Sequence, residues 1–258
     1  MLMTDGALSV GSRTLEVQRL DAPAGRPTIV FLHEGLGSVE QWRDFPVALA
    51  QRCGYGAVMY SRYGNGRSEI LREKRVPGYM HHEALAVLPE LLRLLDIERP
   101  VLFGHSDGAS IALIHAGVFP GRVAALVLEA PHVIVESCSL ASIAAIGEHY
   151  RTGGLREKMA RYHLDVDRTF FGWNDIWLDR DFAGWDIRDA VREITAPALV
   201  IQGADDEYGT LRQLDLLAAN SRAPADRLVL ARCGHAPHRD RRAAVEDATQ
   251  RWLGDNLQ

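Results

Sequence analysis

The chain has 258 residues and a formal net charge of −5, with 29 lysine and arginine residues against 34 aspartate and glutamate residues. Its basic residues are scattered, which argues against nucleic acid or an anionic membrane as a partner. The three cysteines, Cys53, Cys138 and Cys233, have the spacing of neither a disulfide framework nor a metal site. We therefore expect a reducing compartment, no metal, no cofactor and a small-molecule substrate.

The length suits one α/β domain with an insertion. The first residues contain no basic region followed by an apolar stretch, and no apolar run approaches the length of a bilayer. These patterns predict a cytoplasmic protein without a membrane partner, and they leave the oligomeric state open.

The first third of the chain reads as strands at the start of a sheet. Residues 8–10 and 14–20 alternate across a Gly-Ser turn, which predicts an antiparallel hairpin at a sheet edge. Residues 28–32 and 56–60 are continuous apolar runs, typical of parallel strands buried on both faces. Between them, Ser38 is expected to cap a helix that runs through Trp42 and Leu49.

The middle of the chain alternates between helix and strand patterns. Residues 79–95 have the period of a long amphipathic helix, a strand begins at Pro100, a helical segment follows it, and residues 123–128 form another buried strand. This alternation predicts a mostly parallel, doubly wound sheet with crossover helices.

Residues 132–194 lose the strand pattern and contain helix-like segments at 139–150 and 155–163. We interpret them as a helical cap inserted into a core domain made of residues 1–131 and 195–258. The cap holds eight of the 19 aromatic residues. We expect some of them, Trp173 and Trp177 in particular, to bind substrate, although packing of the cap against the core would also account for them. Strands at 198–202 and 228–231 and a helix at 242–253 complete the core.

The central motif is Gly104-His105-Ser106-Asp107-Gly108, which lies between an apolar strand and a helical segment. A serine in so sharp a strand-to-helix turn has a strained backbone, and side chains two residues to either side would collide, so glycine is needed at both places. The hydroxyl is then lifted clear of the backbone, and the helix directs its N–H groups and positive dipole end at the reaction centre.

This strand, Gly-x-Ser-x-Gly and helix order resembles the nucleophile elbow of the α/β-hydrolase fold superfamily. The resemblance covers almost the whole chain except the cap. It implies an α/β-hydrolase fold in which Ser106 is the nucleophile.

The same resemblance implies an oxyanion hole. Residues 33–38 are similar to the oxyanion loop of the superfamily, so the backbone N–H of Gly35 or Leu36, together with that of Asp107, would hold the carbonyl oxygen as it gains charge. Glu34 stands where the superfamily commonly has glycine. Residues 61–68 resemble its Asp-x-x-Gly-x-Gly-x-Ser turn, with Ser61 in place of the aspartate.

A serine hydroxyl needs a base within hydrogen-bond reach and a third group to orient that base. In α/β-hydrolases the order along the chain is serine, acid, histidine, each just beyond a strand, which implies Ser106, Asp206 and His235. Glu129 is an alternative acid one strand earlier, and His238 is an alternative base.

Other roles follow with less support from spacing. The set Asp205, Asp206, Glu207, His235 and His238 is not interpreted as a metal site, because Pro237 breaks the helix that would present two histidines on one face. Glu34 and His105 are candidate substrate-binding residues beside the elbow. The carboxylates of Asp107 and Glu34 would oppose a developing oxyanion unless they point away, pair, or face a positive group.

Arg62 is the nearest candidate partner for these two carboxylates by topology. The alternative is that one of them binds an amine or hydroxyl on the substrate.

The sequence thus predicts a serine hydrolase acting on a small carboxylic ester or lactone through an acyl-enzyme. A thioesterase, a carbon–carbon bond hydrolase and a ligand-binding receptor with a slow triad remain alternatives.

Overall fold

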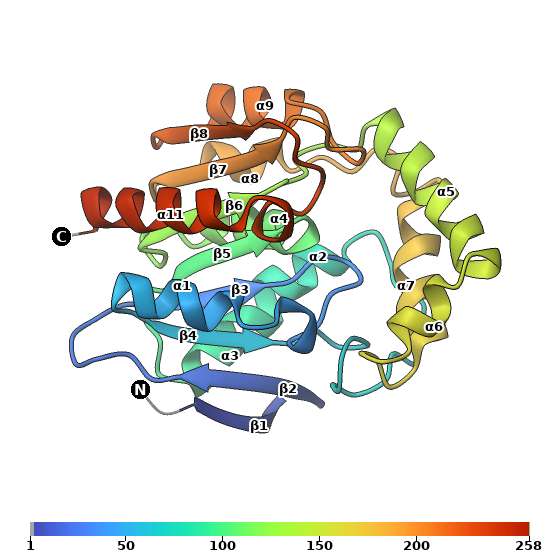
Figure 1. Cartoon of the computed structure of the whole chain (residues 1–258), viewed down its shortest axis with the longest axis horizontal. Coiled ribbons are helices and arrows are strands. Elements are labelled where there is room, and N and C mark those ends of the chain that lie inside the picture. Colours follow the sequence, from blue (N-terminus) through green and yellow to red (C-terminus); the bar gives the residue numbers. More distant parts are fainter. Residues whose placement is uncertain (1–2, 258) are drawn as a thin grey trace.

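An eight-stranded sheet forms the centre of the computed structural model, which describes residues 3–257 (Figure 1). The strand order is β1-β2-β4-β3-β5-β6-β7-β8; β1 and β2 pair in the antiparallel sense and β3 to β8 are parallel. The strands are β1 (Met3–Val10), β2 (Arg13–Leu20), β3 (Thr28–Leu32), β4 (Gly56–Tyr60), β5 (Val101–His105), β6 (Ala125–Glu129), β7 (Ala198–Gly203) and β8 (Ala225–Leu230). The predicted mostly parallel sheet with an antiparallel hairpin at its edge is confirmed.

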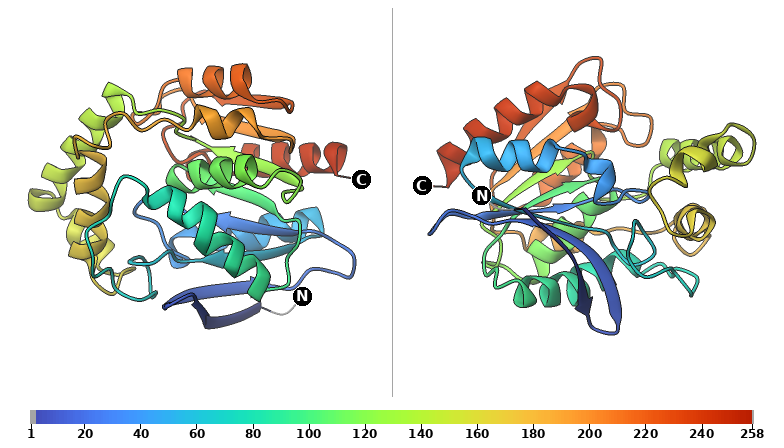
Figure 2. Two further views of the ribbon diagram at one scale, coloured as in Figure 1. Left: turned by 180° about the vertical axis from the view of Figure 1, so that it is seen from behind. Right: turned by 60° about the horizontal axis from the view of Figure 1, so that its bottom comes forward.

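Helices cover both faces of this sheet (Figure 2). The side chains of Ile29 and Phe31 on β3 join the core under α1 (Phe45–Cys53) and α11 (Arg242–Asn256). Those of Val30 and Leu32 join the core on the opposite face, because side chains alternate along a strand. That second layer contains α2 (Tyr79–His82), α3 (Leu88–Leu94), α4 (Asp107–Val118), α8 (Arg188–Arg192) and α9 (Arg212–Asn220).

Three further helices lie between β6 and β7 at the carboxyl ends of the parallel strands (Figure 1). They are α5 (Ser137–Thr152), α6 (Leu155–Met159) and α7 (Val166–Trp177). The side chain of Asp165 caps α7 by accepting a hydrogen bond from the N–H of Arg168 (3.0 Å). The boundary of a separate cap at residues 132–194 stays a prediction, and α8 within this range packs against α4 of the core.

The predicted single helix from Ser38 to Leu49 is wrong. A 3₁₀ turn spans Glu40–Trp42, Arg43 has a positive φ of 56°, and α1 begins at Phe45. Pro46 in the first turn of α1 explains the new start, since proline favours that position and disfavours helix before it.

The helix at 79–95 forms with a π-helical stretch, Glu83–Val87, between α2 and α3. Within residues 3–257, no helix combines the length and the apolar character needed to cross a bilayer.

Candidate active site

Ser106 lies at the turn from β5 into α4 with φ 54° and ψ −118°. Few non-glycine residues occupy this region, so the turn holds Ser106 in a strained conformation. A Cβ on residue 104 would collide with the backbone of Ala109, and one on residue 108 would collide with the carbonyl of Leu32. The two glycines therefore let α4 pack closely on β5 and β3.

Three side chains from three strand ends meet at this turn. His235 Nε2 lies 2.9 Å from Ser106 Oγ, and His235 Nδ1 lies 2.9 Å from each carboxylate oxygen of Asp206. The N–H of Tyr208 (2.8 Å) and the side-chain amide of Gln202 (2.6 Å) donate hydrogen bonds to Asp206 and fix its orientation. The arrangement matches a nucleophile, a base and an orienting acid.

The charges around His235 favour its protonated form. Burial lowers the pKa of the imidazole, but the hydrogen bond to Asp206 and the negative charges of Asp206, Glu34 and Glu207 outweigh burial, so the pKa is raised above the ordinary histidine value. Burial likewise raises the pKa of Asp206, whereas the hydrogen bond and charge of His235 lower it below the ordinary value. The carboxylate is thus ionised and ready to stabilise an imidazolium.

The alternative acid and base pair with each other. Glu129 Oε2 lies 2.6 Å from His238 Nδ1, and both side chains are buried. His105, expected to bind substrate, is also buried, and its Nε2 lies 2.7 Å from the backbone carbonyl of His235. Successive side chains of a strand point to opposite sides, so His105 on β5 points away from the side of Ser106. Its ring lies behind His235 and does not line the cavity at Ser106.

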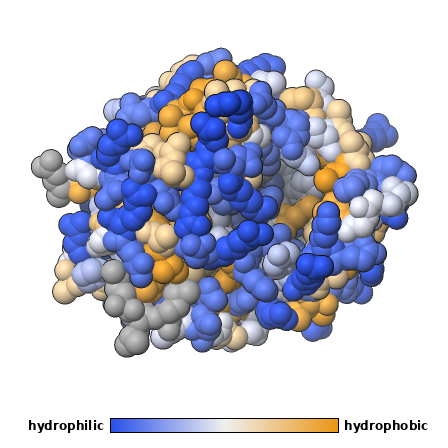
Figure 3. Space-filling view, viewed as in Figure 1, coloured by the Kyte–Doolittle hydropathy of each residue, from blue (hydrophilic) through white to orange (hydrophobic). Residues whose placement is uncertain are grey.

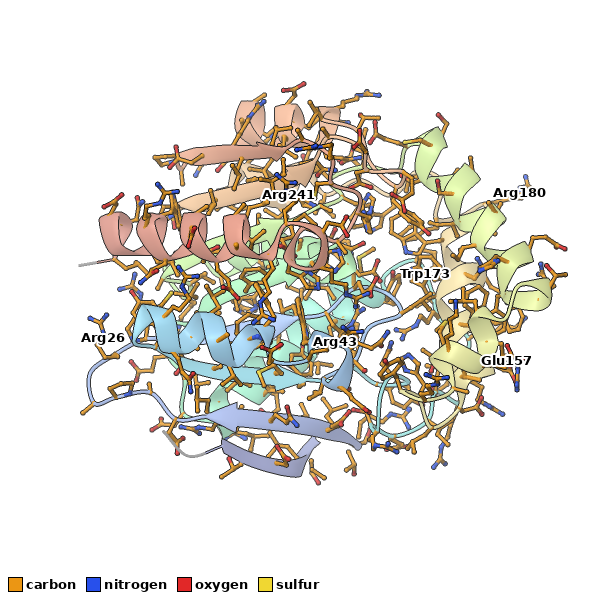
Figure 4. All side chains as sticks on the ribbon, viewed as in Figure 1. Arg26, Arg43, Glu157, Trp173, Arg180 and Arg241 are labelled. Carbon is orange, nitrogen blue, oxygen red and sulfur yellow. The ribbon has the colours of Figure 1, made fainter. Side chains whose placement is uncertain are left out.

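A cavity of about 270 Å³ opens at Ser106 Oγ, between the strand ends and the helices α5 to α7. Its walls are mostly apolar, and the space-filling view shows a hollow with apolar residues between the main body and these helices (Figure 3). Trp173 projects from α7 toward the strand ends (Figure 4). The residues that line the cavity include Glu34, Gly35, Leu36, Ser106, Asp107, His132, Trp173, Trp177, Tyr208, His235 and Arg239.

The candidate oxyanion donors Gly35, Leu36 and Asp107 all line the same cavity as Ser106. Asn65 donates hydrogen bonds of 3.1 Å to the carbonyls of both Gly35 and Gly37, which fixes the loop after β3. A Cβ on residue 35 would collide with the indole of Trp173, so glycine here lets this tryptophan of α7 pack directly on the loop.

The two carboxylates beside these donors have partners. Asp107 accepts hydrogen bonds from Tyr79 Oη (2.7 Å) and Trp177 Nε1 (3.2 Å), and its Oδ2 lies 3.6 Å from Arg62 Nη1. Glu34 Oε1 lies 3.5 Å from Nη2 of Arg239, an exposed side chain in the helix after His235. The expected pairing with Arg62 therefore holds for the Asp107 carboxylate and not for that of Glu34.

Sequence reasoning missed several cavity residues. The rings of His132 and Tyr208 lie 5.8 Å and 4.7 Å from the His235 ring, and Arg239 lines the cavity beside Glu34. Burial lowers the pKa of His132 to about 4, so this histidine is neutral. Tyr208 could have been found as the second residue after the acid; His132 carries no local signal. Within the described residues 3–257, no group of three metal-ligand side chains comes together.

Comparison with known proteins matches residues 29–248 to the alpha/beta hydrolase family. The proline iminopeptidase of Lactobacillus delbrueckii subsp. lactis is 22% identical, covering 98% of this chain and 99% of that protein. A 2-hydroxy-6-oxononadienedioate/2-hydroxy-6-oxononatrienedioate hydrolase of Paraburkholderia phymatum is 25% identical, covering 87% of this chain and 86% of that protein.

Solved structures show the same fold. The 2-hydroxy-6-oxo-6-phenylhexa-2,4-dienoate hydrolase of Rhodococcus sp. strain RHA1 has a TM-score of 0.79 at 17% identity and covers 97% of this chain and 98% of its own. The enol-lactonase of Burkholderia xenovorans LB400 has a TM-score of 0.75 at 19% identity and covers 96% of this chain and all (100%) of its own. These likenesses confirm the predicted fold.

Proposed function

The chain belongs to the alpha/beta hydrolase family, and we propose that within this family it is a serine hydrolase that cleaves a small carboxylic ester or lactone through an acyl-enzyme. The observation that carries the proposal is the unbroken series of contacts from Ser106 Oγ through His235 to Asp206, each of 2.9 Å. Such a series activates a hydroxyl at neutral pH.

In the proposed reaction, His235 Nε2 takes the proton of Ser106 Oγ while the oxygen attacks the substrate carbonyl carbon. The N–H groups of Asp107 and of Gly35 or Leu36 stabilise the oxyanion of the tetrahedral intermediate. The carbon–oxygen bond to the alcohol then breaks, and His235 gives its proton to the departing alkoxide. Water, deprotonated by His235, then attacks the acyl carbon, and the bond from this carbon to Ser106 Oγ breaks as His235 returns the proton to Oγ and the acid is released.

The cavity supports a small and largely apolar acyl group. Its volume of about 270 Å³ lies slightly below the usual range for ligand sites, and its walls are mainly aliphatic and aromatic. Asp107 already accepts two hydrogen bonds and lies beside Arg62, and the half-exposed Arg239 lies 3.5 Å from Glu34, so each carboxylate already has a cation beside it. We therefore propose neutral acyl esters and lactones as substrates.

A panel of nitrophenyl esters tests this proposal. We expect turnover of the acetate and butyrate esters, a fall in kcat/KM for long-chain esters because the cavity is small, and no preference for amino-acyl esters over neutral ones of equal length. A strong preference for amino-acyl esters that Glu34→Gln abolishes would instead indicate an aminopeptidase-like specificity. Absence of ester turnover together with tight ligand binding would support a receptor.

The pH dependence of kcat/KM should follow His235. The neutral imidazole is the base, and the pKa of this group is raised, so kcat/KM should increase with pH through one apparent pKa above the ordinary histidine value. Stopped assays of a neutral ester across acidic to alkaline buffers measure this profile. A profile that stays level through the acidic range would contradict the assignment of a histidine base.

A carbon–carbon bond hydrolase is the second candidate function. Two of the similar proteins named above, one from the sequence comparison and one from the structural comparison, are named as hydrolases of 2-hydroxy-6-oxo compounds. The same nucleophile and base could serve it. Turnover of a 2-hydroxy-6-oxo-dienoate faster than of any ester in the panel would favour this candidate.

A further inference from the structure

The pair formed by Arg62 and Asp107 lies directly behind the proposed oxyanion hole. The two side chains are 2% and 1% exposed, and Arg62 Nη1 lies 3.6 Å from Asp107 Oδ2. Burial of a charged pair lowers the stability of the fold unless further hydrogen bonds satisfy both groups. Arg62 has few: no hydrogen bond forms at its buried Nε and Nη1 among the described residues. The stability of the fold alone gives little reason to keep this arginine.

The Asp107 carboxylate creates the need for a positive charge here. Asp107 follows the nucleophile directly, and its own N–H is a proposed oxyanion donor. Tyr79 and Trp177 donate hydrogen bonds to the carboxylate but carry no net charge, so they leave its negative charge uncompensated. In a buried site, a negative charge this near a developing oxyanion raises the barrier substantially. The guanidinium of Arg62 is the positive group in direct contact with this carboxylate, and the more distant guanidinium of Arg75 attracts it as well.

Arg62 also holds the other side of the proposed hole. Its Nη2 donates a hydrogen bond of 2.6 Å to the carbonyl of Glu34, and His33 Nδ1 lies 2.6 Å from the same oxygen. Burial holds the pKa of His33 well below its ordinary value, so this ring is neutral and donates through Nδ1 while Nε2 accepts from the N–H of Arg62 (3.0 Å).

The hydrogen bond from Arg62 to the carbonyl of Glu34 also sets the direction of the N–H of Gly35. The carbonyl of residue 34 and the N–H of residue 35 belong to one planar trans peptide, and they point in opposite directions. The carbonyl of Glu34 is held by Arg62, by His33 and by the N–H of Gly37 (3.1 Å), so the N–H of Gly35 is turned away from them, on the loop that lines the cavity beside Ser106.

We propose that Arg62 is a positioning residue for the hydrolytic reaction: it cancels the charge of Asp107 and aims the N–H of Gly35, so that both sides of the oxyanion hole are neutral and correctly directed. This inference rests on the proposed serine mechanism. Arg62 contacts no reacting atom and acts through Asp107 and Glu34.

A double-mutant cycle that removes the two charges, with Arg62→Gln, Asp107→Asn and the double variant, tests the proposal. We expect Arg62→Gln to lower kcat by roughly 100-fold with KM changed by no more than about threefold, because the charge that it compensates opposes only the transition state. Adding Asp107→Asn removes the uncompensated carboxylate, so kcat of the double variant should recover at least about tenfold relative to Arg62→Gln.

A merely structural role predicts instead that kcat per folded molecule changes little in Arg62→Gln, and that only the melting temperature falls and then recovers when Asp107→Asn is added, because breaking one side of a buried pair costs stability until both partners are removed. A double variant no faster than Arg62→Gln would overturn the proposal. If Arg62→Gln does not fold, Arg62→Lys keeps the positive charge and should retain kcat to within about tenfold, whereas a loss of 100-fold or more in a folded lysine variant would overturn the charge argument. Thermal unfolding establishes which variants are folded.

Covalent labelling of the wild type distinguishes failure of this proposal from failure of the serine mechanism. A fluorophosphonate should label Ser106 in the wild type whatever the role of Arg62. If the wild type is not labelled at Ser106, the proposed function fails; if it is labelled and the double variant shows no recovery, only the role of Arg62 fails.

Discussion

Ser106→Ala should lower kcat by about 10⁴ to 10⁶-fold, because nucleophile and base act as a unit and the remaining oxyanion donors stabilise only an uncatalysed attack by water. The protein should remain folded, since the substitution removes one hydroxyl whose only hydrogen-bond partner among the described side chains is His235. Steady-state hydrolysis of a nitrophenyl ester measures the change, with kcat calculated per folded enzyme molecule.

Ser110→Ala is the matched control. Ser110 is a fully buried serine in α4, four residues after Ser106, and its hydroxyl donates a hydrogen bond of 2.8 Å to the carbonyl of His132. The variant should lose some stability, about 1 kcal/mol, yet retain kcat to within about tenfold. Equal losses of kcat in Ser106→Ala and Ser110→Ala would point to damage to the helix and away from loss of a nucleophile.

His235→Ala and Asp206→Asn should each reduce kcat severely, by about 10³-fold or more, because one removes the base and the other removes the acceptor that orients it. Asp205→Asn is a near-ideal control for Asp206→Asn. Asp205 is adjacent in sequence but exposed, and within residues 3–257 its one hydrogen bond runs from its backbone N–H to the carbonyl of Cys233 (2.9 Å). Its kcat should be close to that of the wild type.

The second acid and histidine provide the complementary controls. Glu129→Gln and His238→Ala disrupt a buried pair 2.6 Å apart, so they should lower thermal stability while kcat of the folded enzyme changes little. If Glu129→Gln in folded form were as slow as Asp206→Asn, the acid would have to be reassigned to β6.

Sequence reasoning predicted the core because the core is built from local signals. The runs at Thr28–Leu32 and Gly56–Tyr60 are strands over those residues, since apolar stretches bounded by glycine and proline are buried on both faces. The elbow was predictable for a similar reason: its five residues are contiguous, and Gly104 is required by a close contact with the backbone of Ala109 five positions later, although the contact of Gly108 with Leu32 is long-range.

The rest of the site depends on contacts between distant segments. The packing of Trp173 on Gly35 and the hydrogen bond from Trp177 to Asp107 join residues 138 and 70 positions apart, and no local pattern encodes them. The contact of the His105 ring with the backbone carbonyl of His235 likewise joins residues 130 positions apart. The break at Arg43 was missed because the helical period of 38–49 concealed the effect of Pro46.

The central claim is that Ser106 carries the covalent intermediate, and one measurement tests it most directly. The protein is incubated with a fluorophosphonate, digested, and the adduct is located by tandem mass spectrometry, with His235→Ala treated in parallel. We predict a single adduct on Ser106, with labelling strongly slowed in His235→Ala because the base is absent. An adduct on another serine, or labelling at an unchanged rate without His235, would contradict the account.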